Sequence, residues 1–174
     1  VGHIALISNT GSGNTAMGAY SGYFATTADN STFVGYQAGK GITGTKLTGN
    51  DNTAVGKDAG LLLQGAANAN TFIGALSGSA ITTGAGNTFV GALAGDSTDD
   101  GTGCVAVGKE ALAANCGSNN CAVGGDALGL CTGATNTAIG SGAGYDVVGG
   151  DQNIFLGEAA GRAGNPGGAV TTAD

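Results

Sequence analysis

Hydrophobic and polar residues follow one another along this chain in short segments of a single repeated form. Each segment reads Asn, Thr, Ala or Phe, an aliphatic residue and Gly, and a variable loop rich in Gly and Asn follows it. The clearest copies are NTFIGALSG at 70–78 and NTFVGALAG at 87–95. Because β-branched residues occupy most of these positions, the pattern predicts strands rather than helices. Each repeat has room for a short strand, a Gly corner, a second short strand and a loop.

The Gly that ends each segment marks the period of the repeat, and we number it position 0. Ten glycines hold this position: Gly2, Gly18, Gly35, Gly56, Gly74, Gly91, Gly108, Gly124, Gly140 and Gly157. Successive glycines are 16–18 residues apart, except for 21 residues between Gly35 and Gly56. This period indicates stacked coils in which each coil contacts only its neighbours. We therefore expect one all-β domain over 1–174, a parallel β-solenoid or β-roll of about ten coils, about 45 Å long. Because the pattern is already under way at the first residue, we expect a processed portion or fragment of a longer fibre.

In stacked coils, equal positions of successive repeats form columns of side chains. Position −2 contains Ala16, Phe33, Ala54, Phe72, Phe89, Ala106, Ala122, Ala138 and Phe155. Position −1 contains Met17, Val34, Val55, Ile73, Val90, Val107, Val123, Ile139 and Leu156. Adjacent residues of a strand point to opposite faces, so both faces of this strand are apolar. A thin coil has only one interior, so one column must face outward, where a continuous apolar surface indicates a partner.

Position −3 shares a face with position −1 and is mostly Thr, which makes a strip of Thr-x-Val/Ile. We expect either this face or the −2 column to contact a partner. The candidate face consists of Thr15, Met17, Thr32, Val34, Thr53, Val55, Thr71, Ile73, Thr88, Val90, Val107, Val123, Thr137 and Ile139. The small residues at +3 and the apolar residues at +7 (Ile42, Leu63, Ile81 and Val147) are expected inside the coil. Asn recurs at −4, either as an amide ladder or as a turn residue that tolerates left-handed backbone.

The segments STFVGYQAG (31–39), NTAVGKDAG (52–60) and NTAIGSGAG (136–144) resemble the repeats of trimeric fibre proteins. They are similar to the head domains of trimeric autotransporter adhesins and to phage tail-fibre-like surface proteins with arrays of Asn-Thr-Phe-Val-Gly. The resemblance covers essentially the whole chain. It implies a left-handed parallel β-roll, a homotrimer or filament, and attachment or fibre construction at a cell surface or virion surface outside the cell. The chain shows no coiled-coil stalk, membrane anchor or receptor-binding insertion of the kind these families carry.

Charge excludes several partners. Five Lys and Arg against twelve Asp and Glu give a net charge of −7, with no basic stripe for nucleic acid or an anionic membrane surface. No apolar run approaches the roughly 20 residues that would insert into and span a bilayer. The 37 Gly and the single Pro suit repeated tight corners, because Gly readily adopts positive φ.

Four cysteines fall in two adjacent repeats at nearly equal positions. Neighbouring coils are separated by about the Cα distance that a disulfide needs, so we predict Cys104–Cys121 and Cys116–Cys131, formed in an oxidising compartment. Buried free thiols are the alternative. The acidic loop at 95–103 is a weak candidate for Ca²⁺ through Asp96, Asp99 and Asp100, and a solvated loop is the favoured interpretation.

Nothing in the sequence supports catalysis. The single His, His3, lies in the first partial repeat, the paired carboxylates lie in loops and corners, and the repetition leaves no singular pocket. We expect no enzyme activity, no cofactor and no resident metal. Two functions remain: an adhesive or structural fibre module that contacts a surface receptor or other copies, and an ice-binding (antifreeze) solenoid. In the second, the Thr column would contact ice.

Overall fold

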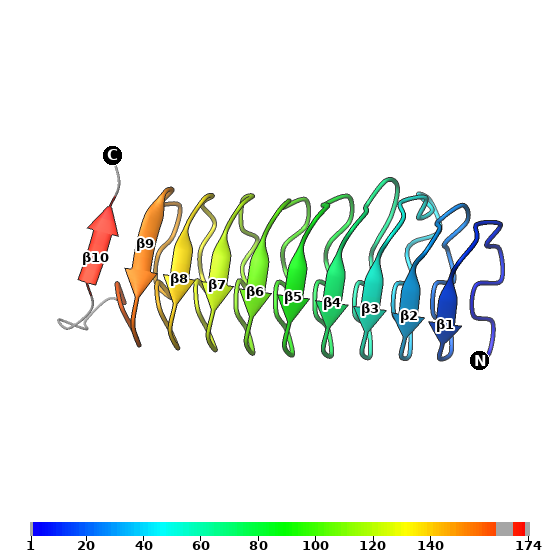
Figure 1. Ribbon diagram of the computed structural model, residues 1–174, viewed down its shortest axis with the longest axis horizontal. Coiled ribbons are helices and arrows are strands. Elements are labelled where there is room, and N and C mark those ends of the chain that lie inside the picture. Colours follow the sequence, from blue (N-terminus) through cyan, green and yellow to red (C-terminus); the bar gives the residue numbers. More distant parts are fainter. Residues whose placement is uncertain (1, 163–168, 173–174) are drawn as a thin grey trace.

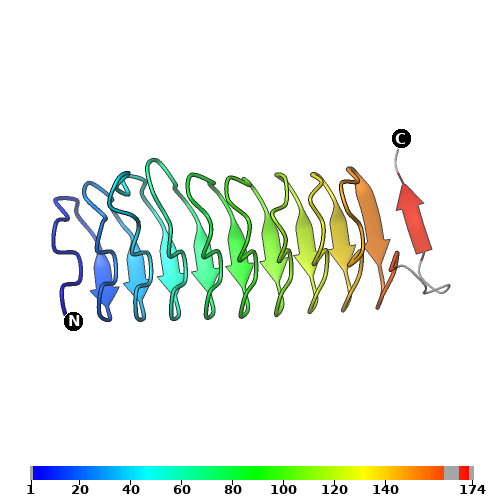
Figure 2. The same ribbon diagram turned by 180° about the vertical axis from the view of Figure 1, so that it is seen from behind.

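The structure is a computed structural model that describes residues 2–162 and 169–172. Ten strands form one sheet in sequence order, and Figures 1 and 2 show β1–β9 side by side in a straight row. The strands are β1 (Thr15–Met17), β2 (Thr32–Val34), β3 (Thr53–Val55), β4 (Thr71–Ile73), β5 (Thr88–Val90), β6 (Val105–Val107), β7 (Cys121–Val123), β8 (Thr137–Ile139), β9 (Asn153–Leu156) and β10 (Ala169–Thr172). The described residues contain no helix. The predicted all-β parallel solenoid is confirmed.

Neighbouring strands pair in the register that the repeat defines. In β4 and β5, Thr71 lies opposite Thr88, Phe72 opposite Phe89, and Ile73 opposite Val90. The pairing of β1 through β9 is parallel throughout. Equal positions of the repeat therefore stack directly, as the columns of the sequence require.

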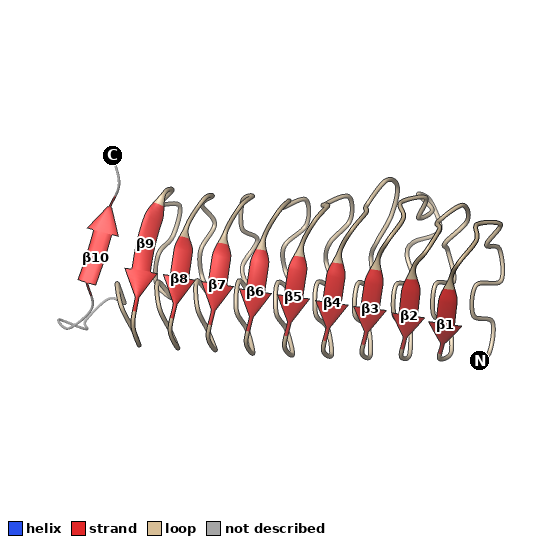
Figure 3. Ribbon diagram, viewed as in Figure 1, coloured by secondary structure: helices blue, strands red, loops and turns tan. Residues whose placement is uncertain are grey.

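The second strand of each repeat was predicted wrongly. Figure 3 shows strands along one wall of the solenoid only, with turns and loops elsewhere in the described coils. Backbone hydrogen bonds between neighbouring coils hold these other walls together, for example from Gly78 N to Ala94 O at 2.9 Å. A turn rather than a strand fits here because positions +2 and +4 have positive φ in most coils, which no strand sustains.

The two ends depart from the repeat. Ten coils were expected from the ten glycines, but the described residues before Gly18 include only one strand, β1, and none belongs to Gly2. The remaining nine glycines, from Gly18 to Gly157, each follow one of the nine parallel strands. At the other end, β10 pairs with β9 in the antiparallel direction. This pairing covers an edge of β9 that the solenoid would otherwise leave for another chain.

The interior is a thin column of Ala and Phe. The −2 residues of β2 through β9 are buried, and the +3 residues from Ser21 to Ala160 are fully buried, which confirms their predicted place inside. Leu63 and Ile81 at +7 are also fully buried, and Val147 packs against the core. Ile42 is only half-buried, because the longer loop between β2 and β3 brings Leu47 into the core instead.

In six of the nine coils from Gly18 to Gly157, a large side chain at position −2 or +4 is combined with a small residue at the other position. A Cβ added to Gly95 would lie 2.3 Å from the ring of Phe89, and a Cβ added to Gly78 would lie 2.6 Å from the ring of Phe72. Where position −2 is Ala106, position +4 is Leu112, which is fully buried with a φ of 52°.

Phe–Gly and Ala–Leu combinations thus fill six coils, whereas the coils with Ala16, Ala54 and Ala138 at −2 have Gly at +4. Side chains of neighbouring coils reach into two of these: a Cβ added to Gly60 would lie 2.9 Å from Phe72, and one added to Gly144 would lie 2.7 Å from Leu128.

The Asn column forms a hydrogen-bonded ladder between coils. Nδ2 of Asn87 donates to Gly101 O at 2.7 Å, and its Oδ1 accepts from Cys104 N at 2.9 Å. The same two kinds of contact recur at Asn14, Asn52, Asn70, Asn120 and Asn136. Left-handed backbone occurs one residue earlier, at Asn30 and Asn119 for example, so the turn interpretation of position −4 is wrong. The ladder satisfies buried backbone groups that a thin coil cannot hydrate.

Candidate assembly surface and neighbouring sites

The Thr-x-Val/Ile strip points away from the core on every strand from β1 to β9. We call the −3 and −1 residues of these strands the outward face. Met17, Ile73, Val107, Ile139 and Leu156 on this face are 54%, 41%, 37%, 44% and 66% exposed. All fourteen residues of the predicted face are exposed or half-buried. The −2 column lies inside the coil, so the expectation that one apolar column faces outward is confirmed for the described chain.

The outward face carries no charge. None of the residues of β1–β9 is Asp, Glu, Lys, Arg or His. Its Thr column is interrupted by Val105, Cys121 and Ile154, which keep the strip apolar where the hydroxyl is missing. The in-register pairing spaces equal side chains by one strand separation, about 4.8 Å, along the whole row. Such a face can bind another regular, uncharged surface.

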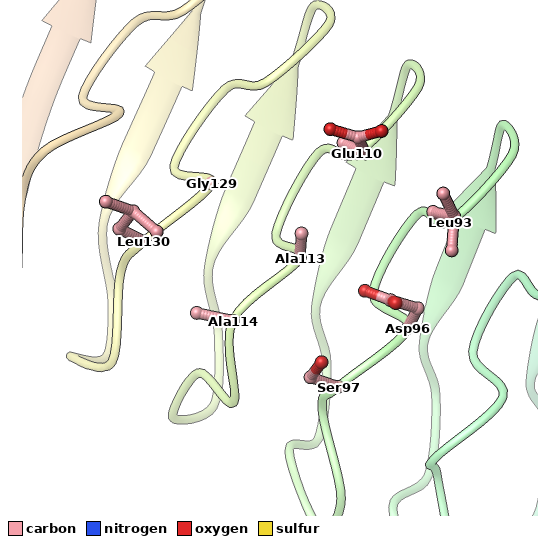
Figure 4. Close-up of a pocket in the computed structure, with 8 residues that line it drawn as sticks. All are labelled: Leu93, Asp96, Ser97, Glu110, Ala113, Ala114, Gly129 and Leu130. Atoms are coloured by element: carbon pink, nitrogen blue, oxygen red, sulfur yellow. The ribbon is translucent and has the colours of Figure 1, made fainter.

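A shallow groove of about 310 Å³ lies among the turns of successive coils, away from the outward face. Figure 4 shows its lining: Leu93, Asp96, Ser97, Glu110, Ala113, Ala114, Gly129 and Leu130. Burial raises the pKa of Asp96, and the nearby Glu110 carboxylate raises it further. Glu110 pairs with Lys109 at 2.6 Å, which lowers the pKa of Glu110. The repeat pattern did not indicate this groove, since its residues come from three different loops.

The calcium candidates do not form a site. Asp96 lies in the groove, whereas Asp99 accepts a hydrogen bond from Thr82 Oγ1 at 2.6 Å in the preceding coil, and Asp100 is exposed. No group of three His, Cys, Asp or Glu side chains in the described part of the chain could hold a metal ion. The Ca²⁺ interpretation of the acidic loop is therefore wrong, because the loop directs its carboxylates to different places.

The predicted disulfides are absent, and all four cysteines are free. Cys104 stands at −4 in the Asn column and is fully buried, whereas Cys121 stands at −3 on the outward face. Adjacent strand positions point in opposite directions, so the thiols of Cys104 and Cys121 lie on opposite sides of the sheet. Cys116 and Cys131 both face the interior but are not bonded to each other.

An aromatic cluster covers the turns of the first coils and was not expected from the repeat. The rings of His3, Tyr23 and Tyr36 each make edge-on contacts with Tyr20, at centroid distances of 6.2, 5.6 and 6.4 Å. Phe24 extends the cluster through Tyr23, at 4.6 Å. These residues occupy variable positions of the repeat, so a comparison of equal repeat positions does not identify them. His3, the single His of the chain, takes part in this cluster through its ring contact with Tyr20.

No helix in 2–162 or 169–172 is long and apolar enough to cross a membrane. Comparison of the chain with protein-family models, with curated proteins and with solved structures found no match. The structure by itself defines the class, a parallel β-solenoid with a repeat of about 17 residues. The trimeric-fibre resemblance of its repeats stays an expectation.

Proposed function

We propose that the protein is a structural or adhesive fibre module, in which other copies of the same chain cover the outward face. The observation that carries this proposal is the uncharged aliphatic column that is exposed or half-buried along nine consecutive strands. An apolar strip of this length is typical of an interaction surface. A second copy is the partner of best fit, because its own face has the same side chains at the same spacing. Attachment to a surface receptor outside the cell would be the task of the assembled fibre.

The size of the outward face sets the strength of assembly. Three residues across and nine strands along give a projected area of about 400 Å². A stable interface buries about 800 Å² on each partner, so one strip from this chain reaches about half of that. We therefore expect association of the 174-residue chain to be weak and dependent on concentration, and to strengthen with every coil that is added.

Analytical ultracentrifugation at concentrations up to about 1 mM tests this proposal. The native chain is expected to form trimers or larger species, and Ile139→Lys is expected to remain monomeric because it places a charge in the apolar contact. Leu130→Lys is the matched control, since Leu130 is also 44% exposed but lies in the groove. A native chain that stays monomeric over the whole range, or equal effects of the two substitutions, would contradict assembly through this face.

The second candidate function is ice binding, which a different feature of the same face favours. Thr15, Thr32, Thr53, Thr71 and Thr88 pair in uninterrupted register and present hydroxyl and methyl groups on a flat strip. A regular array of this kind suits an ordered lattice of water. Thermal hysteresis of the native chain supports this function if Thr71→Tyr removes it and Thr83→Tyr, at an exposed loop position, leaves it unchanged. A native chain without hysteresis eliminates ice binding and leaves the fibre proposal untouched.

A further inference from the structure

Three of the four cysteines lie together in the interior where the Asn ladder is interrupted. Cys104 takes the place of an Asn: its backbone N donates to Asn87 Oδ1, and its Sγ lies 3.3 Å from Gly117 O. In the preceding coil, Asn87 Nδ2 occupies the same place against Gly101 O. The side chain of Cys104 is therefore directed at the loop segment that contains Cys116 and Gly117.

Cys116 is the residue before Gly117, so the Cys104 thiol is directed at the segment that carries the Cys116 thiol. Each of the two thiols is the largest influence on the pKa of the other: the pKa of Cys104 is raised and that of Cys116 is lowered. The Sγ of Cys116 also lies 3.3 Å from Thr98 Oγ1. Both cysteines are buried, at 0% and 2% exposure. Cys131, the partner expected from the sequence, is instead engaged with Asn136 Nδ2 at 3.4 Å and Gly133 O at 3.9 Å.

We propose that Cys104 and Cys116 form a disulfide that joins the start of β6's coil to the closing loop of the same coil across the interior. Both thiols are free in the structure and shielded from solvent. This bond is distinct from both pairs that the repeat suggested, and it goes beyond the function proposed for the outward face. It would replace the missing rung of the Asn ladder with a covalent link.

The oxidant required is a small-molecule disulfide such as oxidised glutathione. The Cys116 thiolate attacks one sulfur of this compound, forms a mixed disulfide and releases one thiolate. The Cys104 thiolate then attacks the Cys116 sulfur and releases the second, so two electrons pass from the protein to the oxidant and two protons leave the protein thiols. In the closed coil, the interaction with Cys104 lowers the pKa of Cys116 to about 7. This influence is lost when the coil opens, so either thiol can make the first attack, and the product is the same.

Burial sets the moment at which the bond forms. An oxidant cannot reach either sulfur in the closed coil, so oxidation belongs to folding or to local opening of the coil around β6. The experiment therefore refolds the full chain from urea in a buffer of oxidised and reduced glutathione. Free thiols are then alkylated, and the chain is digested with trypsin and with a protease that cleaves before Asp.

Cleavage separates the candidate cysteines. Cutting after Lys109 and before Asp100 and Asp126 places Cys104 on 100–109, Cys116 with Cys121 on 110–125, and Cys131 on the following peptide. We expect a disulfide between 100–109 and 110–125, retained in Cys121→Ser and Cys131→Ser and lost in Cys104→Ser. We also expect the bond to raise the thermal midpoint by roughly 5–10 °C over the reduced chain.

Three results would overturn the proposal. A peptide pair joining 110–125 to the Cys131 peptide would show that Cys116 pairs with Cys131. Loss of the 100–109 cross-link in Cys121→Ser, with Cys116 alkylated, would assign the bond to Cys121. Alkylation of all four thiols in the refolded native chain would show that no bond forms. The first and third results are read from the unsubstituted chain. If Cys121→Ser fails to fold, fragmentation of the joined 110–125 peptide of the unsubstituted chain assigns the bond to Cys116 or Cys121.

Discussion

Gly91 stands at the corner that ends β5, where the backbone of the next coil comes closest. Its φ is +141°, and an added Cβ would lie 2.4 Å from Gly108 O. The same close approach joins each strand-ending Gly from Gly18 to Gly140 to the corresponding Gly of the next coil. The invariance of position 0 within the repeat therefore has a steric cause, and it concerns the stacking of coils rather than any bound ligand.

We expect Gly91→Ala to lower the free energy of unfolding by at least about 2–3 kcal/mol, because a side chain there is strained by the backbone and blocked by Gly108. Gly44→Ala is the control: a Cβ added to Gly44 would have no atom within 4 Å, and the φ of Gly44 is not positive. Its effect should therefore lie within about 0.5 kcal/mol of zero. Urea denaturation followed by circular dichroism measures both. Equal stabilities of the two variants would contradict the steric role of position 0.

Single positions also show where the sequence was insufficient. In the repeat, Cys104 is at position −4 and Cys121 is at position −3. This difference of one residue reverses the face of the sheet on which the side chain lies. The expected pair was chosen by closeness along the column rather than by direction. The contact between Cys104 and Cys116 depends on the path of the loop after β6, which no repeat position records.

At the scale of the element, each coil consists of one strand and a set of turns around a narrow interior. Phe89 with Gly95 and Ala106 with Leu112 fill adjacent coils in two different ways. The −2 column alone shows Phe replaced by Ala and predicts a cavity. The paired change from Gly95 to Leu112 at +4 shows that the coil of Ala106 stays filled, and both changes are visible in the sequence.

The pairing of −2 with +4 predicts a coupled effect of substitution. Ala106→Phe alone overfills the coil against Leu112, and Leu112→Gly alone leaves a cavity, so each is expected to destabilise the protein by about 1–5 kcal/mol. Together they recreate the Phe–Gly coil, and the double variant should be more stable than the sum of the two changes by about 1–3 kcal/mol. A double-mutant cycle in urea measures this coupling.

Leu63→Gly provides the control for that cycle, because Leu63 is fully buried but belongs to a coil far from Ala106. Its effect should add to that of Ala106→Phe within about 0.5 kcal/mol. Additivity of Ala106→Phe with Leu112→Gly as well would mean that the two positions do not share one space.

The element scale also separates what could be predicted from what could not. The strand and the alternation of its side chains followed from the spacing of Thr71, Phe72 and Ile73, whereas the sequence left open which of the two faces is the interior. The prediction of a second strand was wrong because a residue such as Leu112 has a positive φ, which its identity as Leu does not indicate. β10 was missed because it lies after the last repeat and pairs in the opposite direction.

At the scale of the whole molecule, the solenoid is a linear array of units that contact only their neighbours. The near-identical segments 70–78 and 87–95 have the same strand, corner and interior positions, and β4 pairs with β5 just as β5 pairs with β6. In such an array, stability and the outward face both grow with the number of coils. The length of the chain is then the property that determines how firmly copies can associate.

Excision of residues 75–91 tests this additivity directly, because it joins Gly74 to Ala92 and restores the segment NTFIGALAG. The shortened chain is expected to fold, with a urea m-value about one tenth smaller, since the surface exposed on unfolding scales with the chain. Its association should weaken by roughly tenfold or more, because one-ninth of the outward face is removed and each 1.4 kcal/mol changes the dissociation constant tenfold. Sedimentation over a concentration series measures that change. Excision of 79–86 is the control, since it removes half a coil and breaks the stacking register, and it should abolish cooperative unfolding. An unfolded chain after the full-coil excision would show that the coils are not independent units of stability. Unchanged association would show that assembly does not depend on the number of coils.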